Sequence, residues 1–143
     1  IVASIDVKKN NEKNRYEVYT HSGTKPTGID PVNHAINVEK LGAGEILLTS
    51  IDNDGVMNGY DLEITKQIAE EVSIPVIASG GAGSYKDMFE VLKIKGVDAV
   101  AAASIFHFTE QTPLEAKLFL KNNGVKVRIW DRRIIFDLFT HWL

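Results

Sequence analysis

Cysteine is absent from this chain of 143 residues. That absence excludes disulfide bonds, thiolate metal sites and a cysteine nucleophile, and it fits a reducing, cytoplasmic location. Neither sign of charge dominates, because 16 basic residues stand against 19 acidic ones and the formal net charge is -3. No general positive field would attract nucleic acid or an acidic membrane, so any anion must be bound locally.

Long apolar runs are also missing. The sequence opens on Ile1–Ile5 with no basic region and no long apolar run. It therefore predicts neither a signal peptide nor a membrane span. We interpret the missing initiator methionine as a hint that the chain is a fragment. A hydrophobic content of 44% in 143 residues suits one globular domain with a real core.

Four short apolar stretches alternate with four amphipathic segments along the chain. The apolar stretches lack clean alternation, as expected of parallel strands buried on both faces. They are Ile1–Val7, Glu45–Ser50, Pro75–Ser79 and Ala99–Ala103. The amphipathic segments have the capping residues and glycines of helix ends. Their predicted starts are Asp30 with Pro31, Asp61, Ser84 and the capping box at Thr112, and their ends lie near Gly42, Val72, Gly96 and Gly124.

The pattern predicts an α/β fold with (βα)4 order. Short connections of this kind require right-handed crossovers, and therefore parallel strands with outer helices. A doubly wound sheet and part of a barrel both satisfy this strand and helix pattern. A complete TIM (β/α)8 barrel needs about 250 residues, so the four units of this chain would be half of one. Within the long charged loop 8–23, the alternation in Tyr16–Thr20 predicts a hairpin over one end.

Residues that can carry chemistry occur at the predicted carboxyl end of every strand. They are Asp6, then Asp52 and Asp54, then Gly80 and Gly81, and finally Ser104. In parallel α/β folds this edge binds ligands, because loops and helix N-termini converge there. The agreement among the four units predicts one site.

The glycine run Ser79–Gly83 joins a predicted strand to a predicted helix. Its backbone amides and the following helix dipole are suited to hold a phosphate, and Ser104 would add an amide and a hydroxyl. The alternative is that these glycines only permit a tight turn. Both readings remain open from the residues alone.

Asp6 follows Ile5 and precedes Val7, in an apolar strand where a carboxylate is costly unless it emerges at the strand end. A carboxylate there suits general acid or base catalysis. The alternative is a salt bridge of Asp6 with Lys8 or Lys9.

No metal and no cofactor is predicted. The run Asp52–Gly55 lacks the ligand spacing of a calcium loop. The histidines His21, His34 and His107 stand singly, without carboxylates at the spacing of metal ligands. No Gly-x-Gly-x-x-Gly opens a helix after the first strand, which argues against a dinucleotide-binding fold.

Several longer strings resemble the cyclase subunits of imidazole glycerol phosphate synthase. They are Asp6 with Lys8, Tyr19–Gly23, Gly42–Asp52, Asp54–Gly55, Gly59–Asp61, Ile77–Gly83 and Ala101–Phe108. The strings are similar to strands five to eight of that (β/α)8 barrel, and the resemblance covers residues 1–128 without a gap. It predicts a half-barrel domain over 1–128 and a separate tail over 129–143.

The resemblance implies a lyase of histidine biosynthesis without cofactor. A ribulosyl-aminoimidazole carboxamide nucleotide would react with ammonia from a glutaminase subunit, giving imidazole glycerol phosphate and an aminoimidazole carboxamide ribotide. Asp6 would be one of two catalytic aspartates. Gly80, Gly81, Ala103 and Ser104 would bind one of two phosphates, and Thr49, Asp54, Gly55 and Ser79 would bind substrate near the glycerol end. The other aspartate, a lysine and the second phosphate site belong to the half that this chain does not match.

One carboxylate cannot act on both sides of one substrate. We therefore expect the chain alone to bind phosphate but to catalyse poorly. An alternative is an inactive half-barrel, natural or engineered for the study of folding and assembly, with residual phosphate binding. A related sugar isomerase of histidine biosynthesis would share the phosphate loops, but not Leu48–Asp52 together with Tyr19–Gly23.

The tail over 129–143 does not match the family. Its apolar residues recur every four positions at Trp130, Ile134, Leu138 and Trp142, which predicts an amphipathic helix. Its polar face is charge-balanced, which argues against a membrane-surface anchor. We interpret it as appended sequence that packs on an apolar surface.

An open four-stranded segment has two unpaired edges and an exposed apolar inner face. A second copy related by a twofold axis would pair first and last strands and close eight strands. We therefore expect self-association, with a dimer favoured over a tetramer and each Asp6 facing its mate.

Overall fold

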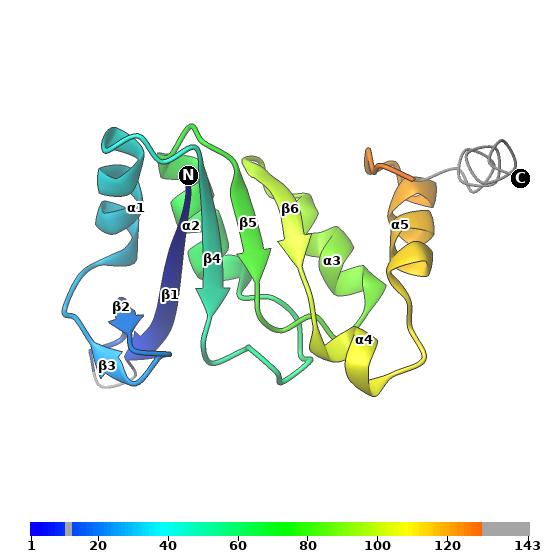
Figure 1. The fold of residues 1–143 in the computed structure, drawn as a ribbon, viewed down its shortest axis with the longest axis horizontal. Helices are drawn as coiled ribbons and strands as arrows, with labels where there is room; N and C mark the ends of the chain where they lie inside the picture. The colour runs from blue at the N-terminus through cyan, green and yellow to red at the C-terminus, as the bar shows by residue number, and fades with distance from the viewer. Residues whose placement is uncertain (11–12, 130–143) are drawn as a thin grey trace, which may run out of the picture.

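The computed structural model describes residues 1–10 and 13–129, so the predicted tail helix lies outside the described residues apart from Ile129. Four strands, β1 (Val2–Asn10), β4 (Glu45–Ser50), β5 (Val76–Ser79) and β6 (Val97–Ala101), lie parallel in that order. The hairpin strands β2 (Arg15–Thr20) and β3 (Lys25–Pro26) continue the sheet beyond β1 in antiparallel pairing. Together they form one six-stranded sheet, and Figure 1 shows β1, β4, β5 and β6 side by side. The predicted α/β class, the parallel strands and the hairpin are confirmed.

Helices follow the parallel strands, and all of them except α4 were predicted. They are α1 (Pro31–Lys40), α2 (Leu62–Glu71), α3 (Tyr85–Leu92), α4 (Ser104–Phe108) and α5 (Pro113–Asn122). Each predicted N-cap side chain, on Asp30, Asp61, Ser84 and Thr112, accepts a hydrogen bond from an amide of its first helical turn. Such a cap stabilises a helix by about 1 kcal/mol. None of the helices within the described residues is long and apolar enough to cross a membrane.

Three predicted strand boundaries are wrong by two residues or more, one of them the start of the last strand, which is Val97 instead of Ala99. Asp6 does not end its strand, because β2 pairs with residues 6–10 and extends β1 to Asn10. The last strand ends at Ala101 instead of Ala103, which is the N-cap of the unpredicted α4. A helix of five residues is too short to show a helical hydrophobic period, so periodicity could not reveal it.

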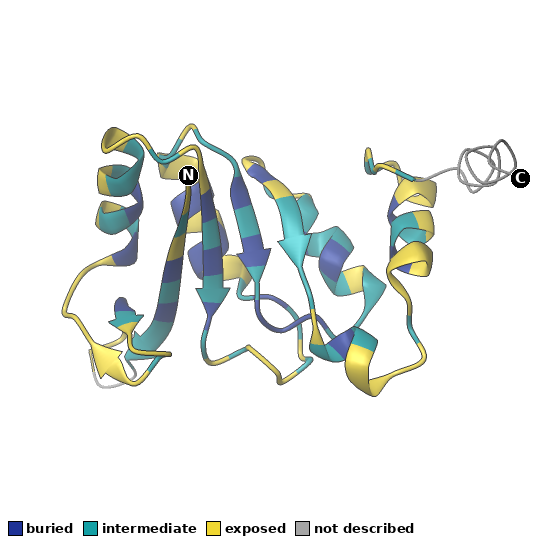
Figure 2. Cartoon of the chain, viewed as in Figure 1, coloured by how far each residue is buried: buried dark blue, intermediate teal, exposed yellow. Residues whose placement is uncertain are grey.

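The sheet has a covered face and an open face (Figure 2). On the covered face, packed against the helices, the buried strand side chains include Ile5, Val7, Ile46, Leu48, Val76, Ala78 and Val97. The open face carries two rows of register partners. One row is Ser4, Leu47, Ile77 and Ala99, and the next, nearer the carboxyl ends, is Asp6, Thr49, Ser79 and Ala101. All eight of these residues are partly or fully exposed, as on the inner face of a partial TIM barrel.

Candidate functional site

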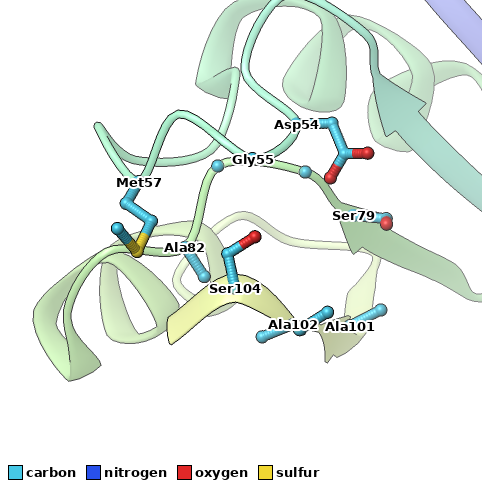
Figure 3. Close-up of a pocket in the computed structure, with 11 residues that line it drawn as sticks. Asp54, Gly55, Met57, Ser79, Ala82, Ala101, Ala102 and Ser104 are labelled. Carbon is cyan, nitrogen blue, oxygen red and sulfur yellow. The ribbon is translucent and has the colours of Figure 1, made fainter. Parts of the chain in front are cut away.

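Three loops at the carboxyl ends of β4, β5 and β6 enclose a cavity of about 150 Å³. Seven residues predicted from the sequence line it: Asp54, Gly55, Ser79, Gly80, Gly81, Ala103 and Ser104. Figure 3 shows the side chains of Asp54, Ser79 and Ser104 around this hollow, each from a different loop or strand end. The cavity wall also includes Met57, Ala82, Ala101 and Ala102, to which the sequence had suggested no binding role.

Asp6 and Thr49 border a second, more open hollow of about 380 Å³. Its other lining residues are Ser22, Gly23, Ile51 and Asp54. Because Asp54 lines both hollows, the two are adjacent. The sequence predicted a single site, and the structure has a small cavity beside a broader groove.

The glycines of the β5–α3 loop have a packing role. Gly80 and Gly81 have φ angles of 88° and 107°, which L side chains rarely adopt. A Cβ atom on Gly81 would lie 2.1 Å from the carbonyl oxygen of Gly59, and one on Gly80 would lie 2.7 Å from that of Ser50. The loop thus lies directly against the β4–α2 segment, and the tight turn requires glycine at both positions whether or not the loop binds an anion.

The N-terminus of α3 is closed by its own capping box. The carboxylate of Asp87 accepts the amides of Gly83 at 3.1 Å and Ser84 at 2.8 Å. These two amides are therefore satisfied within the helix start. An anion in the cavity would contact backbone amides nearer the strand, because the lining residues include the carboxylate of Asp54 but neither lysine nor arginine.

Asp6 is partly exposed on the open face. The alternative in which it pairs with a neighbouring lysine is not supported. Lys8 lies 3.7 Å from Asp52, and Lys9 lies 2.9 Å from Glu63. Within residues 1–10 and 13–129, no group of three histidine, aspartate or glutamate side chains is arranged to hold a metal ion.

Two tyrosines, whose roles the sequence did not reveal, hold the loops through hydrogen bonds of their hydroxyls. Tyr60 is buried and donates its hydroxyl to the carbonyl of Ala101 at 3.0 Å. Tyr16 of β2 donates to the carboxylate of Asp61 at 3.0 Å. Burial is the largest cause that raises the pKa of both tyrosines. The second cause is the negative charge of Asp87 for Tyr60 and the hydrogen bond to Asp61 for Tyr16. Both hydroxyls are therefore protonated donors at neutral pH.

Comparison with known proteins agrees with the resemblance seen in the strings. The family model described as histidine biosynthesis protein matches residues 1–112. Imidazole glycerol phosphate synthase subunit HisF is 53% identical over 129 residues in Dehalococcoides mccartyi, 52% in Petrotoga mobilis and 54% in Pyrococcus furiosus. The aligned part is 90% of this chain but only 50–51% of those proteins, so the chain spans about half the length of the curated relatives it matches. The chain therefore belongs to the histidine biosynthesis protein family and is closely similar to its cyclase subunits.

Proposed function

We propose that this chain supplies one phosphate site and one catalytic carboxylate of a cyclase of histidine biosynthesis. The observation that carries the proposal is the adjacency of a small loop-lined cavity and a groove that contains Asp6, joined at Asp54. A long substrate anchored by a phosphate in the cavity would extend over the groove. The same adjacency suits ring closure and cleavage of a ribulosyl-aminoimidazole carboxamide nucleotide by ammonia, without a cofactor.

The cavity is the proposed phosphate site. At about 150 Å³ it is smaller than the roughly 300–1,000 Å³ pockets that enclose drug-sized ligands, so it suits a group of the size of a phosphate. Backbone amides near Gly80, Gly81, Ala103 and Ser104 and the Ser104 hydroxyl would bind the oxygens. Gly55 and Ser79 would line the entrance, beside Asp54 and Thr49.

Asp6 is the proposed proton donor or acceptor. It lies on the open face, where a substrate lying across the groove would be within reach of its carboxylate. The opposite side of the substrate needs a second carboxylate, which we assign to the part of the relatives that this chain does not match. The chain alone would then bind phosphate but convert the nucleotide slowly. In the complete enzyme, which we place in the cytoplasm, a glutaminase would supply the ammonia. The rival function is phosphate binding that remains in an inactive half-barrel.

Titration with inorganic phosphate, followed by amide NMR, tests the first part of the proposal. Saturable shifts at Gly81 and Ser104 are expected, and their absence would refute the phosphate site. Steady-state assays with the nucleotide and ammonia test the second part. We expect turnover to rise when the N-terminal half of a cyclase relative is added, whereas no rise in any folded mixture would favour the inactive half-barrel.

We also propose that the open face binds a second copy of the chain. Leu47 and Ile77 are partly exposed there, and β6 is the edge strand of the sheet. On the β1 side the hairpin already pairs with residues 6–10, so only Val2–Ile5 is open to a new strand. In the twofold arrangement each Asp6 would face its mate across the shared groove.

A further inference from the structure

Three consecutive residues before α2, Gly59–Asp61, bind three separate parts of the fold. The amide of Gly59 donates to the carbonyl of Gly81 at 2.8 Å. The hydroxyl of Tyr60 donates to the carbonyl of Ala101 at 3.0 Å. The carboxylate of Asp61 accepts from the hairpin through Tyr16. We name Gly59–Asp61 the clasp segment.

Both carbonyls that the clasp segment holds belong to peptide planes that border the cavity. A trans peptide is planar, and its C=O and N–H point in opposite directions. The carbonyl of Gly81 therefore shares a rigid plane with the amide of Ala82, and the carbonyl of Ala101 shares one with the amide of Ala102. Ala82 and Ala102 both line the cavity. A bond that holds each carbonyl from behind fixes the direction of the amide on the other side of its plane.

Tyr60 lies behind the cavity and is not among its lining residues. Its side chain is only 6% exposed, and its ring belongs to the hydrophobic core. The hydroxyl donates to Ala101 at the end of β6, which is 41 residues away in the sequence. A phenylalanine would fill the same core volume, so the hydroxyl has a separable role.

We propose that Tyr60 is a positioning residue for the phosphate cavity, because its hydroxyl holds the carbonyl of Ala101 and so orients the amide of Ala102. Gly59 performs the matching task for Ala82 through the carbonyl of Gly81. The inference rests on the phosphate site proposed above and adds the element that orients its donors. Tyr60 itself does not touch the ligand.

The substitution Tyr60→Phe tests this role, with inorganic phosphate as the probe. Two variants serve as controls. Tyr85→Phe removes another tyrosine hydroxyl that donates to a backbone carbonyl, that of Thr112 at 3.3 Å, between α3 and α5. Thr65→Val removes a buried hydroxyl that donates at 2.6 Å to the carbonyl of Asp61, the last residue of the clasp segment, and leaves the bonds to Gly81 and Ala101 in place.

Amide NMR of the full chain gives two readouts in one titration. We expect Tyr60→Phe to shift the Ala102 amide before phosphate is added and to raise the dissociation constant for phosphate about 2- to 10-fold. The controls should change that constant less than about twofold, while thermal unfolding reports their loss of stability. If Tyr60→Phe does not fold in plain buffer, the titration is repeated in sucrose, which stabilises folded states by exclusion from the protein surface.

The outcomes separate this inference from the function on which it rests. Absence of saturable phosphate binding by the unmodified chain refutes the proposed function and, with it, the role of Tyr60. Binding by the unmodified chain that Tyr60→Phe leaves unchanged overturns only the inference. Equal weakening in Tyr60→Phe and both controls would also overturn it, because the effect would then follow general stability. Selective weakening with a shifted Ala102 amide supports it.

Discussion

Asp6 of β1 and Thr49 of β4 are direct register partners in adjacent parallel strands, and both border the groove beside the cavity. Side chains of register partners in parallel strands lie on the same face of the sheet. The carboxylate and the hydroxyl therefore face the same ligand space. Their neighbours in the same row, Ser79 and Ala101, line the cavity, so one row of the sheet joins the proposed proton-transfer group to the proposed phosphate site.

The first prediction concerns Asp6→Asn. The amide has nearly the same shape as the carboxylate but cannot exchange the proton, so the ring-closure rate should fall by roughly 10²- to 10⁴-fold. The measurement is turnover with the complementary half supplied. The dissociation constant for inorganic phosphate should stay the same, because Asp6 does not line the cavity. A comparable loss of phosphate affinity would show that Asp6 acts on binding.

The second prediction compares Gly81→Ala with Gly42→Ala. Both glycines have positive φ angles, 107° and 94°, so both variants bear the left-handed backbone cost of about 1–2 kcal/mol. A Cβ on Gly42 has nothing within 4 Å, whereas one on Gly81 meets the Gly59 carbonyl. We expect Gly81→Ala to lose roughly 1–3 kcal/mol more free energy of unfolding in urea than Gly42→Ala. Phosphate binding should be lost only in Gly81→Ala, and equal behaviour of the two would refute the close-packing argument.

The parts of this fold that local sequence determines were predictable. Each N-cap predicted from Asp30, Asp61, Ser84 and Thr112 forms, because capping depends on residues within three or four positions. The buried parallel strands were recognisable from continuous apolar runs. The glycine loop and Ser104 were found because they follow such strands, and they do meet in one cavity.

The missed features depend on contacts between distant residues. The end of β1 is set by its pairing with β2, which changes an expected strand end into a strand interior at Asp6. Tyr60 could be read only as a core aromatic, because its partner Ala101 is far away in the sequence. Ser22 and Gly23 reach the groove from the hairpin turn, a placement that requires the folded path of the chain.

The third prediction is a pH dependence at Glu63. Hydrogen bonds from Lys9 and then from Tyr16 lower the pKa of the Glu63 carboxyl below its usual 4.5. Because the folded pKa is the lower one, the stabilisation is present above the unfolded pKa of 4.5 and is lost as pH falls through the folded pKa.

Urea midpoints of the unmodified chain and of Glu63→Gln should therefore differ most above about pH 5.5 and converge below the folded pKa. The difference should be small and should shrink in high salt, since the pair is exposed. The same substitution in a Lys9→Met background is the control and should show a weaker dependence. A difference between the two midpoints that is the same at pH 3 and pH 7 would contradict the assignment.

The fourth prediction concerns self-association through the open face. If a second copy covers that face, light scattering after size exclusion at micromolar concentration should give the mass of a dimer. Ile77→Lys places a charge in the middle of the buried interface, and an unpaired buried charge costs several kcal/mol. The dissociation constant of the dimer should then rise by more than about 100-fold, and the variant should elute as a monomer.

Leu41→Lys is the matched control, because Leu41 follows α1 at the other end of the strands and is 79% exposed. It adds the same charge away from the interface and should leave the dimer intact. A stable monomer of the unmodified chain would refute self-association, and a dimer that survives Ile77→Lys would refute the geometry in which each Asp6 faces its mate.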